Sequence, residues 1–201
     1  VFQERQVLNQ HNPGEKIAFA QLAALAHDPE SAPDGVAPGL DFHHEYTLPQ
    51  SPVSFGAHAV VVEVNQDTMA VKILRYVGVH DCGQIINPMI VEGQVHGGVV
   101  QGAGQALWEG AVYDDSGQLL TGSMMDYAVP RAHMVPDIEV LSTVPPSPHN
   151  PLGIKGIGET GAIASTVTIY NAVMDALKPL GVTKLDMPLT PERIWLAIHQ
   201  G

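Results

Sequence analysis

The feature that most limits how this 201-residue chain can fold is a predicted helix crowded with glycine. Asn87-Pro88 is typical of a helix start, with Asn as the N-cap and Pro at the first helical position. The helix is predicted to run from Pro88 to about Glu109. Five glycines fall inside it, at positions 93, 97, 98, 102 and 104, and each costs up to about 1 kcal/mol relative to alanine. We therefore expect another group to pack very close to this backbone.

The pattern around this helix predicts an α+β fold in a single domain or fragment spanning residues 1–201. Segments rich in Val and Ile at 57–65 and 69–80 are separated by a short polar turn, which predicts a β-hairpin. The order of elements lacks the regular βαβ alternation of a doubly wound sheet, so we expect a mixed sheet or hairpin with packed helices. The other expected elements are helices at 15–27, at 160–178 and from 191, strands at 136–144 and near Tyr46-Thr47-Leu48, and loops at 28–56 and 145–158.

Composition excludes several classes of partner. The net charge of −12 opposes binding to nucleic acid and to anionic membrane surfaces. No apolar run approaches the roughly 20 residues that span a bilayer, and the polar start is not a signal peptide. The single cysteine, Cys82, cannot form an internal disulfide or hold an iron–sulfur cluster alone. We expect a reducing compartment, the cytoplasm.

The most informative segment for chemistry is the loop from Gly153 to Gly161, with the sequence GIKGIGETG. Its glycines allow close approach of the backbone to a ligand. Glu159 falls where this loop enters a predicted helix, whose dipole favours a charged carboxylate. A carboxylate held there could accept a proton. The alternative is that Glu159 only caps the helix.

The same loop matches the dinucleotide-binding pattern G-x-G-x-x-G over residues 156–161. The residues before it form a proline-rich loop rather than a strand. Glu159 would also place a negative charge where a pyrophosphate must lie. A nicotinamide-dependent enzyme is therefore an alternative that the context does not favour, and saturable NAD(P)H binding would revive it.

A second candidate surface lies on the glycine-rich helix. Gln94, Gly98, Gln101 and Gln105 are spaced to form one polar face with small residues. Glutamine amides donate and accept hydrogen bonds without charge, which suits a neutral heterocycle or an oxo group better than a metal cation. The alternative is tight helix–helix packing with the glutamines at its edge.

Ten histidines are present, but none has the spacing of a metal site. We therefore predict structural roles for them and no metal ligands from this chain. Cys82 is expected to be a small buried residue at the end of a strand rather than a reactive thiol.

Four segments together resemble the C-terminal end of the large subunit of carbon monoxide dehydrogenase-type enzymes, in the xanthine oxidase and aldehyde oxidoreductase superfamily. The resemblance covers nearly the whole chain and is firmest over residues 45–200. The segments are DCGQIINPMIVEGQVHGGVVQGAGQALWE (81–109), MDYAVPRAHMVPDIEV (125–140), NPLGIKGIGETG (150–161) and MPLTPERIWLAI (187–198).

The resemblance implies a molybdenum hydroxylase in which Glu159 is the base beside molybdenum and Gln94 lies at the pterin. It implies a molybdenum-pterin cofactor, as molybdopterin or its cytosine dinucleotide form, with iron–sulfur clusters and FAD on partner subunits. The cofactor-binding residues expected on this basis are Gln94, Gly97, Gly98, Gln101, Lys155, Gly156 and Gly158.

The large subunits of this family are several times longer than this chain. We therefore expect a fragment, or a short subunit, that needs the rest of the large subunit or a separately encoded partner and is inactive alone. The first methionine, Met69, agrees with a fragment. The substrate stays open among carbon monoxide, aldehydes and purines. A further alternative is a non-catalytic assembly module or remnant that keeps the fold without cofactor.

Overall fold

The chain forms two compact units, residues 1–47 and residues 48–201. The computed structural model describes residues 2–12, 14–41 and 43–200. This division does not test whether the chain is a fragment of a longer subunit, and that expectation stays a prediction.

The first unit is a small antiparallel sheet followed by a helix. Strands β1 (Phe2–Gln3), β2 (Gln6–Leu8) and β3 (Lys16–Ala18) pair in that order, and helix α1 (Phe19–His27) follows directly. The helix was expected from residue 15. It begins four residues later because residues 16–18 use their backbone groups to pair with β2. The strands of two or three residues are too short for an alternating pattern to reveal them.

The second unit is built on a three-stranded sheet in the order β4-β5-β6. Strands β4 (Phe55–Val64) and β5 (Val71–Asp81) form the predicted hairpin, with an irregularity between Val61 and Val62. Strand β6 (Ile138–Thr143) lies parallel to β5. The predicted α+β class, with a hairpin and packed helices, is confirmed.

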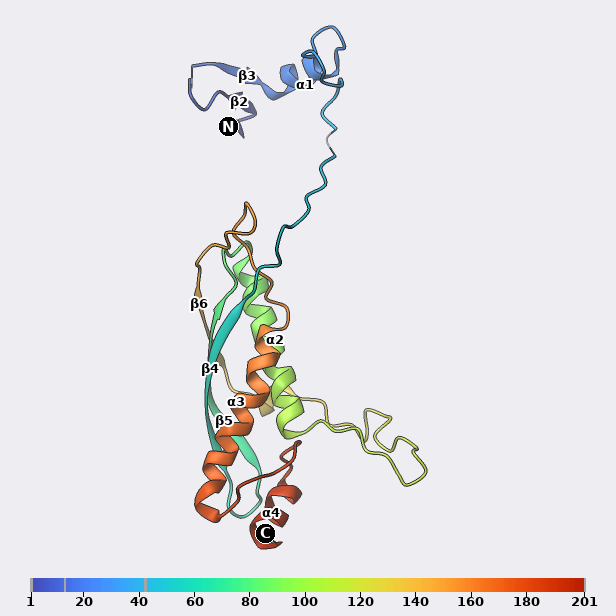
Figure 1. Ribbon diagram of the computed structural model, residues 1–201, viewed down its shortest axis with the longest axis vertical. Helices are drawn as coiled ribbons and strands as arrows, with labels where there is room; N and C mark the ends of the chain where they lie inside the picture. Colours follow the sequence, from blue (N-terminus) through green and yellow to red (C-terminus); the bar gives the residue numbers. More distant parts are fainter. Residues whose placement is uncertain (1, 13, 42, 201) are drawn as a thin grey trace. The chain divides into compact units, whose positions relative to one another are not determined.

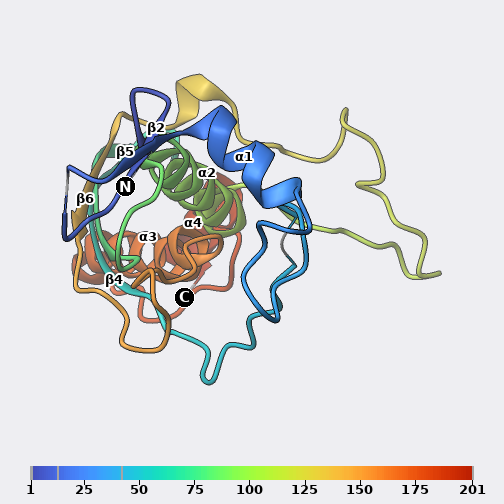
Figure 2. The same ribbon diagram turned by 90° about the horizontal axis from the view of Figure 1, so that it is seen from above.

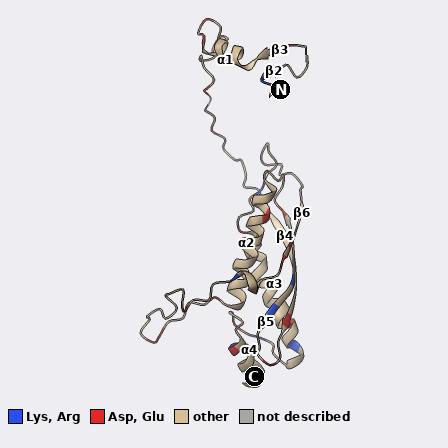
Figure 3. Cartoon of the chain, turned by 180° about the vertical axis from the view of Figure 1, so that it is seen from behind, with Lys and Arg blue, Asp and Glu red and all other residues tan. Residues whose placement is uncertain are grey.

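Helices α2 (Pro88–Leu107) and α3 (Thr160–Leu177) lie side by side against one face of this sheet (Figures 1 and 2). The side chain of Asn87 accepts a hydrogen bond from the Ile90 amide, so the predicted N-cap is confirmed. Each helix carries a single Asp, Glu, Lys or Arg, which are Glu92 and Asp175 (Figure 3).

The glycines of α2 let its backbone touch α3. A Cβ atom on Gly98 would lie 2.8 Å from the Ala162 amide nitrogen, and one on Gly161 would lie 2.8 Å from the Val95 carbonyl oxygen. Real Cβ atoms do not approach other atoms this closely. The close approach predicted from the glycines is therefore confirmed for Gly98 and Gly102, whose partner is α3. A Cβ atom on Gly104 would instead meet Glu109 and Pro130, and one on Gly93 or Gly97 would meet nothing within 4 Å.

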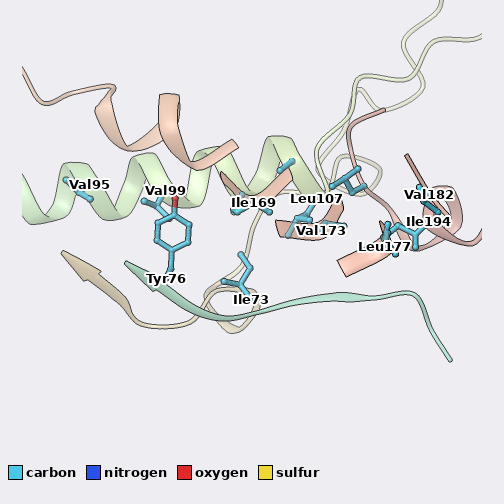
Figure 4. Close-up of a cluster of buried hydrophobic side chains, with 13 residues drawn as sticks. Ile73, Tyr76, Val95, Val99, Leu107, Ile169, Val173, Leu177, Val182 and Ile194 are labelled. Carbon is cyan, nitrogen blue, oxygen red and sulfur yellow. The ribbon is translucent and has the colours of Figure 1, made fainter. Parts of the chain in front are cut away.

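The hydrophobic core lies between the sheet and the two helices (Figure 4). Strand β5 contributes Tyr76 and Ile73 to it. Helix α4 (Pro191–Gln200) closes one end through Ile194. Helices α2 and α3 supply most of the remaining buried side chains, including Val95, Val99, Leu107, Ile169, Val173 and Leu177.

Two details of the chain differ from expectation. Residues 46–48 form no strand, and Tyr46 and Leu48 are exposed, so this segment has no sheet face to bury. After α3, a short 3₁₀ helix η2 (Lys178–Leu180) extends the chain before Gly181 turns it in the left-handed conformation, with φ of 85°. A second 3₁₀ helix, η1 (Ala132–Met134), precedes β6.

Candidate functional site

The two segments that the sequence singled out lie against each other in the folded chain. The start of α3 packs on α2 through Gly161 and Gly98. Just before that contact, Gly158 lies beside Gln94, because a Cβ atom on Gly158 would be 3.9 Å from the Gln94 Nε2 atom. The glycine loop and the glutamine face therefore belong to one surface.

Glu159 occupies the N-cap position of α3, but its side chain makes no capping hydrogen bond within that described turn. The side chain is exposed. The next residue, Thr160, is tied to the beginning of β4, with its Oγ1 atom 3.2 Å from the Ser54 Oγ atom. The alternative that the Glu159 carboxylate only caps the helix is therefore not supported, and this carboxylate remains available to a neighbour.

Helix packing accounts for the small residues of the glutamine face and leaves two of its glutamines exposed. Gly98 and Gly102 are buried against α3, as helix packing requires. Gln94 and Gln101 are exposed. Gly97 is exposed too, and a Cβ atom there would meet nothing within 4 Å, so its backbone is open to a ligand.

The loop that leads to Glu159 is bonded to the end of β5. The Lys155 amide donates to the Cys82 carbonyl at 2.9 Å, and the Gln84 amide donates to the Gly153 carbonyl at 2.9 Å. The Lys155 ammonium group pairs with the Asp81 carboxylate, at 2.5 Å from Nζ to Oδ2. These bonds make the first part of the loop continuous with the sheet.

The buried Asp81 carboxylate is stabilised in its charged form by its hydrogen-bond partners. Burial acts to raise the pKa of Asp81, but the hydrogen bond from Lys155 and that from the Gly83 amide hold the pKa below its usual range. The Asp81 side chain is fully buried and that of Lys155 is nearly so. Lys155 was expected among the cofactor-binding residues, and in the structure its ammonium group forms an ion pair with Asp81.

The Asn150 side chain forms hydrogen bonds within the same loop. Its side-chain amide donates to the Ile154 carbonyl at 2.8 Å and accepts from the Ile154 amide at 3.1 Å. The Gly153 amide donates to the Asn150 carbonyl at 3.1 Å, and Gly153 adopts a left-handed φ of 68°. The left-handed turn explains why glycine is needed at this position.

The exposed residues of the two segments fit a planar, neutral, polar group. Gln94 and Gln101 offer amide donors and acceptors. A Cβ atom on Gly156 would meet nothing within 4 Å, as at Gly97, so two stretches of backbone are open to close contact. Gly98 and Lys155 differ from these residues, because Gly98 packs against α3 and the Lys155 ammonium group pairs with Asp81.

Pockets lie at both ends of α2. One of about 260 Å³ lies beside the loop and is lined by Cys82, Ile90, Lys155 and Ile157, among others. Cys82 is buried directly after β5, as predicted, and burial raises the pKa of its thiol. A second pocket, of about 640 Å³, lies at the far end of α2, and of the residues singled out from the sequence it includes Gln105.

A pair formed by the half-buried His58 and the buried His80 was missed by the sequence reasoning. The Nδ1 atom of His58 lies 2.6 Å from the Tyr76 hydroxyl, and its Nε2 atom lies 3.0 Å from the Nε2 atom of His80. His58 faces Gly78 in the hairpin, and His80 faces Gly56, so glycines make room for both rings. Burial, and then the neighbouring His80, lower the pKa of His58 to about 4. Only the hairpin register, with each histidine opposite a glycine, could have indicated this pair.

Within residues 2–12, 14–41 and 43–200, no three His, Cys, Asp or Glu side chains gather as metal ligands. The helices of that same part of the chain also include none that is long and apolar enough to cross a membrane.

Comparison with known proteins identifies relatives of the whole chain. It is 39% identical to the carbon monoxide dehydrogenase large chain of Hydrogenophaga pseudoflava over 93% of its length. It is 41% identical to the nicotine 6-hydroxylase large subunit of Paenarthrobacter nicotinovorans over 89% of its length. The chain spans 23% and 22% of these relatives.

The solved structure of quinoline 2-oxidoreductase from Pseudomonas putida 86 is similar over 100% of this chain and 26% of its own, with a TM-score of 0.93 and 38% sequence identity. The likeness therefore includes the loop that carries Glu159. Residues 1–136, which contain all of α2, match the family described as "Molybdopterin cofactor-binding domain". This match covers more than half of the chain, and the chain belongs to that family.

Proposed function

We propose that this chain forms one wall of the cofactor site of a molybdenum hydroxylase, with Glu159 as the catalytic base. The observation that carries the proposal is the contact between the start of α3 and α2. It brings an unbonded carboxylate, one residue after Gly158, to the surface that Gln94 lines. A proton acceptor would then lie next to a set of neutral amide groups.

Glu159 would accept a proton at a carboxylate oxygen during substrate oxidation. Its side chain makes no helix-capping bond, so proton transfer would not break the start of α3. Thr160 and Gly161, the first two residues of α3, are held through Ser54 and Gly98. The bound molybdenum-pterin group would supply the redox chemistry, and Glu159 would supply the base.

The exposed part of the wall would hold the pterin. Gln94 and Gln101 would hydrogen-bond to its ring edges, and the open backbone at Gly97, Gly156 and Gly158 would allow it to approach closely. These groups suit the pterin of molybdopterin and of its cytosine dinucleotide form equally. Gly98 and Lys155 would lie behind the wall, because the first packs on α3 and the second pairs with Asp81.

The complete enzyme would be an oxidoreductase of several parts. The relatives are named as the large chain or large subunit of a dehydrogenase or hydroxylase, and this chain spans about a quarter of them. The opposite wall of the site would therefore come from the rest of the large subunit or from a separate partner. Iron–sulfur clusters and FAD on partner subunits would carry the electrons away, and the chain alone would be inactive.

The test is Glu159→Gln in the assembled enzyme. Turnover should fall by a factor of roughly 10² to 10⁴, the usual contribution of a general base, while the molybdenum content stays unchanged. Glu192→Gln is a matched control, because Glu192 is also an exposed glutamate at the start of a helix. Its turnover should equal that of the wild type.

Full turnover in Glu159→Gln would refute the assignment of the base. An assembled complex that contains neither molybdenum nor pterin would instead favour the non-catalytic module.

A further inference from the structure

Asp81, the last residue of strand β5, has a carboxylate that is buried away from water. The Asp81 side chain is 0% exposed, and its two oxygens are both used. Oδ1 accepts from the Gly83 amide at 2.9 Å, and Oδ2 accepts from Lys155 Nζ. A buried charge is retained only where such partners compensate for the lost water.

The ion pair lies inside a junction between the sheet and the loop. Backbone bonds from Lys155 to Cys82 and from Gln84 to Gly153 flank it. A side chain on Gly83 would overlap the Gly153 carbonyl oxygen, so the two segments are in direct contact. The Lys155 ammonium group also lies 5.6 Å from the centre of the Phe55 ring, on the neighbouring strand β4.

Beyond this junction the chain is held less closely. Gly156 is exposed, and a Cβ atom there would meet nothing within 4 Å. A Cβ atom on Gly158 would have only Gln94 within 4 Å. Between these two glycines Ile157 packs against the core, and after Glu159 the chain is held again by the contacts of Thr160 with Ser54 and of Gly161 with Gly98. Glu159 therefore lies between this junction and the contacts at the start of α3. The ion pair and the Asn150 side chain, which bonds to Ile154, both fix the loop at the junction.

We infer that Asp81 and Lys155 are positioning residues, which set the place of the Glu159 carboxylate by fixing the loop to the sheet. This inference rests on the proposed function of Glu159. It assigns Lys155 to Asp81 rather than to direct contact with the cofactor. Neither residue touches the reacting atoms, and each acts through the loop.

The pair is expected to behave as a single unit. Lys155→Met leaves the Asp81 charge buried without its cation, and Asp81→Asn releases the Lys155 ammonium group. Either substitution breaks the ion pair and loosens the loop, so the second substitution is expected to add little to the loss of activity. The variant with both substitutions leaves no buried unpaired charge, and it therefore folds even where Lys155→Met alone does not.

The test uses the assembled enzyme with Asp81→Asn, Lys155→Met and the double variant. We expect each to lower kcat per molybdenum by roughly ten- to a hundredfold, the cost of a small misplacement of a catalytic group, with KM little changed. Molybdenum and pterin content should be retained. Amide hydrogen exchange over residues 153–161 should rise in all three, and the double variant should be no worse than the more affected single variant. Asp175→Asn with Lys178→Met, an exposed Asp and Lys on and next to α3, is the matched control and should change nothing.

Two results would overturn the inference. If Lys155→Met lost pterin and molybdenum while Asp81→Asn kept both, Lys155 would be a cofactor contact. If the two single effects on kcat simply added up, with hydrogen exchange over 153–161 unchanged, the pair would not position the loop. Hydrogen exchange needs no turnover, so a fully active Glu159→Gln variant would defeat the proposed function and still leave the coupling between Asp81 and Lys155 measurable.

Discussion

The imidazole rings of His58 and His80 meet inside the hairpin of the larger unit, with their Nε2 atoms 3.0 Å apart. In such a contact one ring donates a proton and the other accepts it, so the pair is stable only while at least one of the two is neutral. His58 also bonds to the buried Tyr76 hydroxyl. The pair therefore joins the two strands of the hairpin underneath the helices that form the candidate site.

Acid should weaken this region. The pKa of His58 falls from 6.5 to about 4 in the folded chain, with burial as the main cause. Between these values the unfolded chain binds more protons, so stability is complete above about pH 6.5 and is lost as the pH falls towards 4. Because His58 is only half-buried, solvent screening reduces the effect, and the loss from His58 should be about 1–3 kcal/mol. Thermal unfolding across this pH range would measure it. His58→Gln, which keeps hydrogen-bonding groups without a titrating ring, should show a flatter pH dependence, and an equal acid loss in that variant would contradict this account.

Alanine at neighbouring glycines of α2 should have opposite effects. A Cβ atom at Gly98 would lie 2.8 Å from the Ala162 nitrogen, and Gly98→Ala should destabilise the protein by about 1–3 kcal/mol. Gly97 and Gly93 have free space, so alanine there should stabilise the helix by about 0.5–1 kcal/mol. Denaturant unfolding would show the difference.

The same glycines test the proposed pterin surface. Gly97→Ala should lower the molybdenum and pterin content of the assembled enzyme in spite of its stabilising effect on the helix, because it adds a methyl group where the cofactor would approach. Gly93→Ala is the matched control and should keep full content. Equal, full occupancy in both variants would remove Gly97 from the proposed surface.

Two glutamines of α2 should also differ. Gln94 lies beside Gly158, whereas Gln105 accepts a hydrogen bond from Thr166, at 3.2 Å, further along the helices. Gln94→Leu should weaken cofactor retention by roughly tenfold, the value of one or two hydrogen bonds, and Gln105→Leu should not. Measuring the pterin released on dialysis of the assembled enzyme would compare them. Equal retention by both variants would rule out the proposed role of Gln94.

Local signals predicted much of the larger unit. Asn87-Pro88 marked the start of α2 because capping chemistry is contained in adjacent residues, and the hairpin followed from two β-rich segments around a short turn. The glycines of α2 correctly indicated a close neighbour. Their partner, Gly161, is a long-range contact, and nothing in the spacing within α2 could name it.

The features that the sequence did not reveal depend on distant pairing. The pairing of Lys155 with Asp81 could not be predicted, because the two residues lie 74 positions apart and no local pattern joins them. The pairing of β6 with β5 and the meeting of His58 with His80 also arise only once the sheet forms. The roles of Glu159 and Gln94 came from the family resemblance and remain predictions.

The contact between Gly98 and Gly161 has one further consequence. Two main chains that touch directly have no intervening side chain to rotate, tilt or compress, so α2 and α3 are expected to move together. The separation between Gln94 and the start of α3 is thus set by the backbone itself. If a ligand or a partner changes the shape of the proposed cofactor site, that change has to occur in whatever lies opposite this pair of helices.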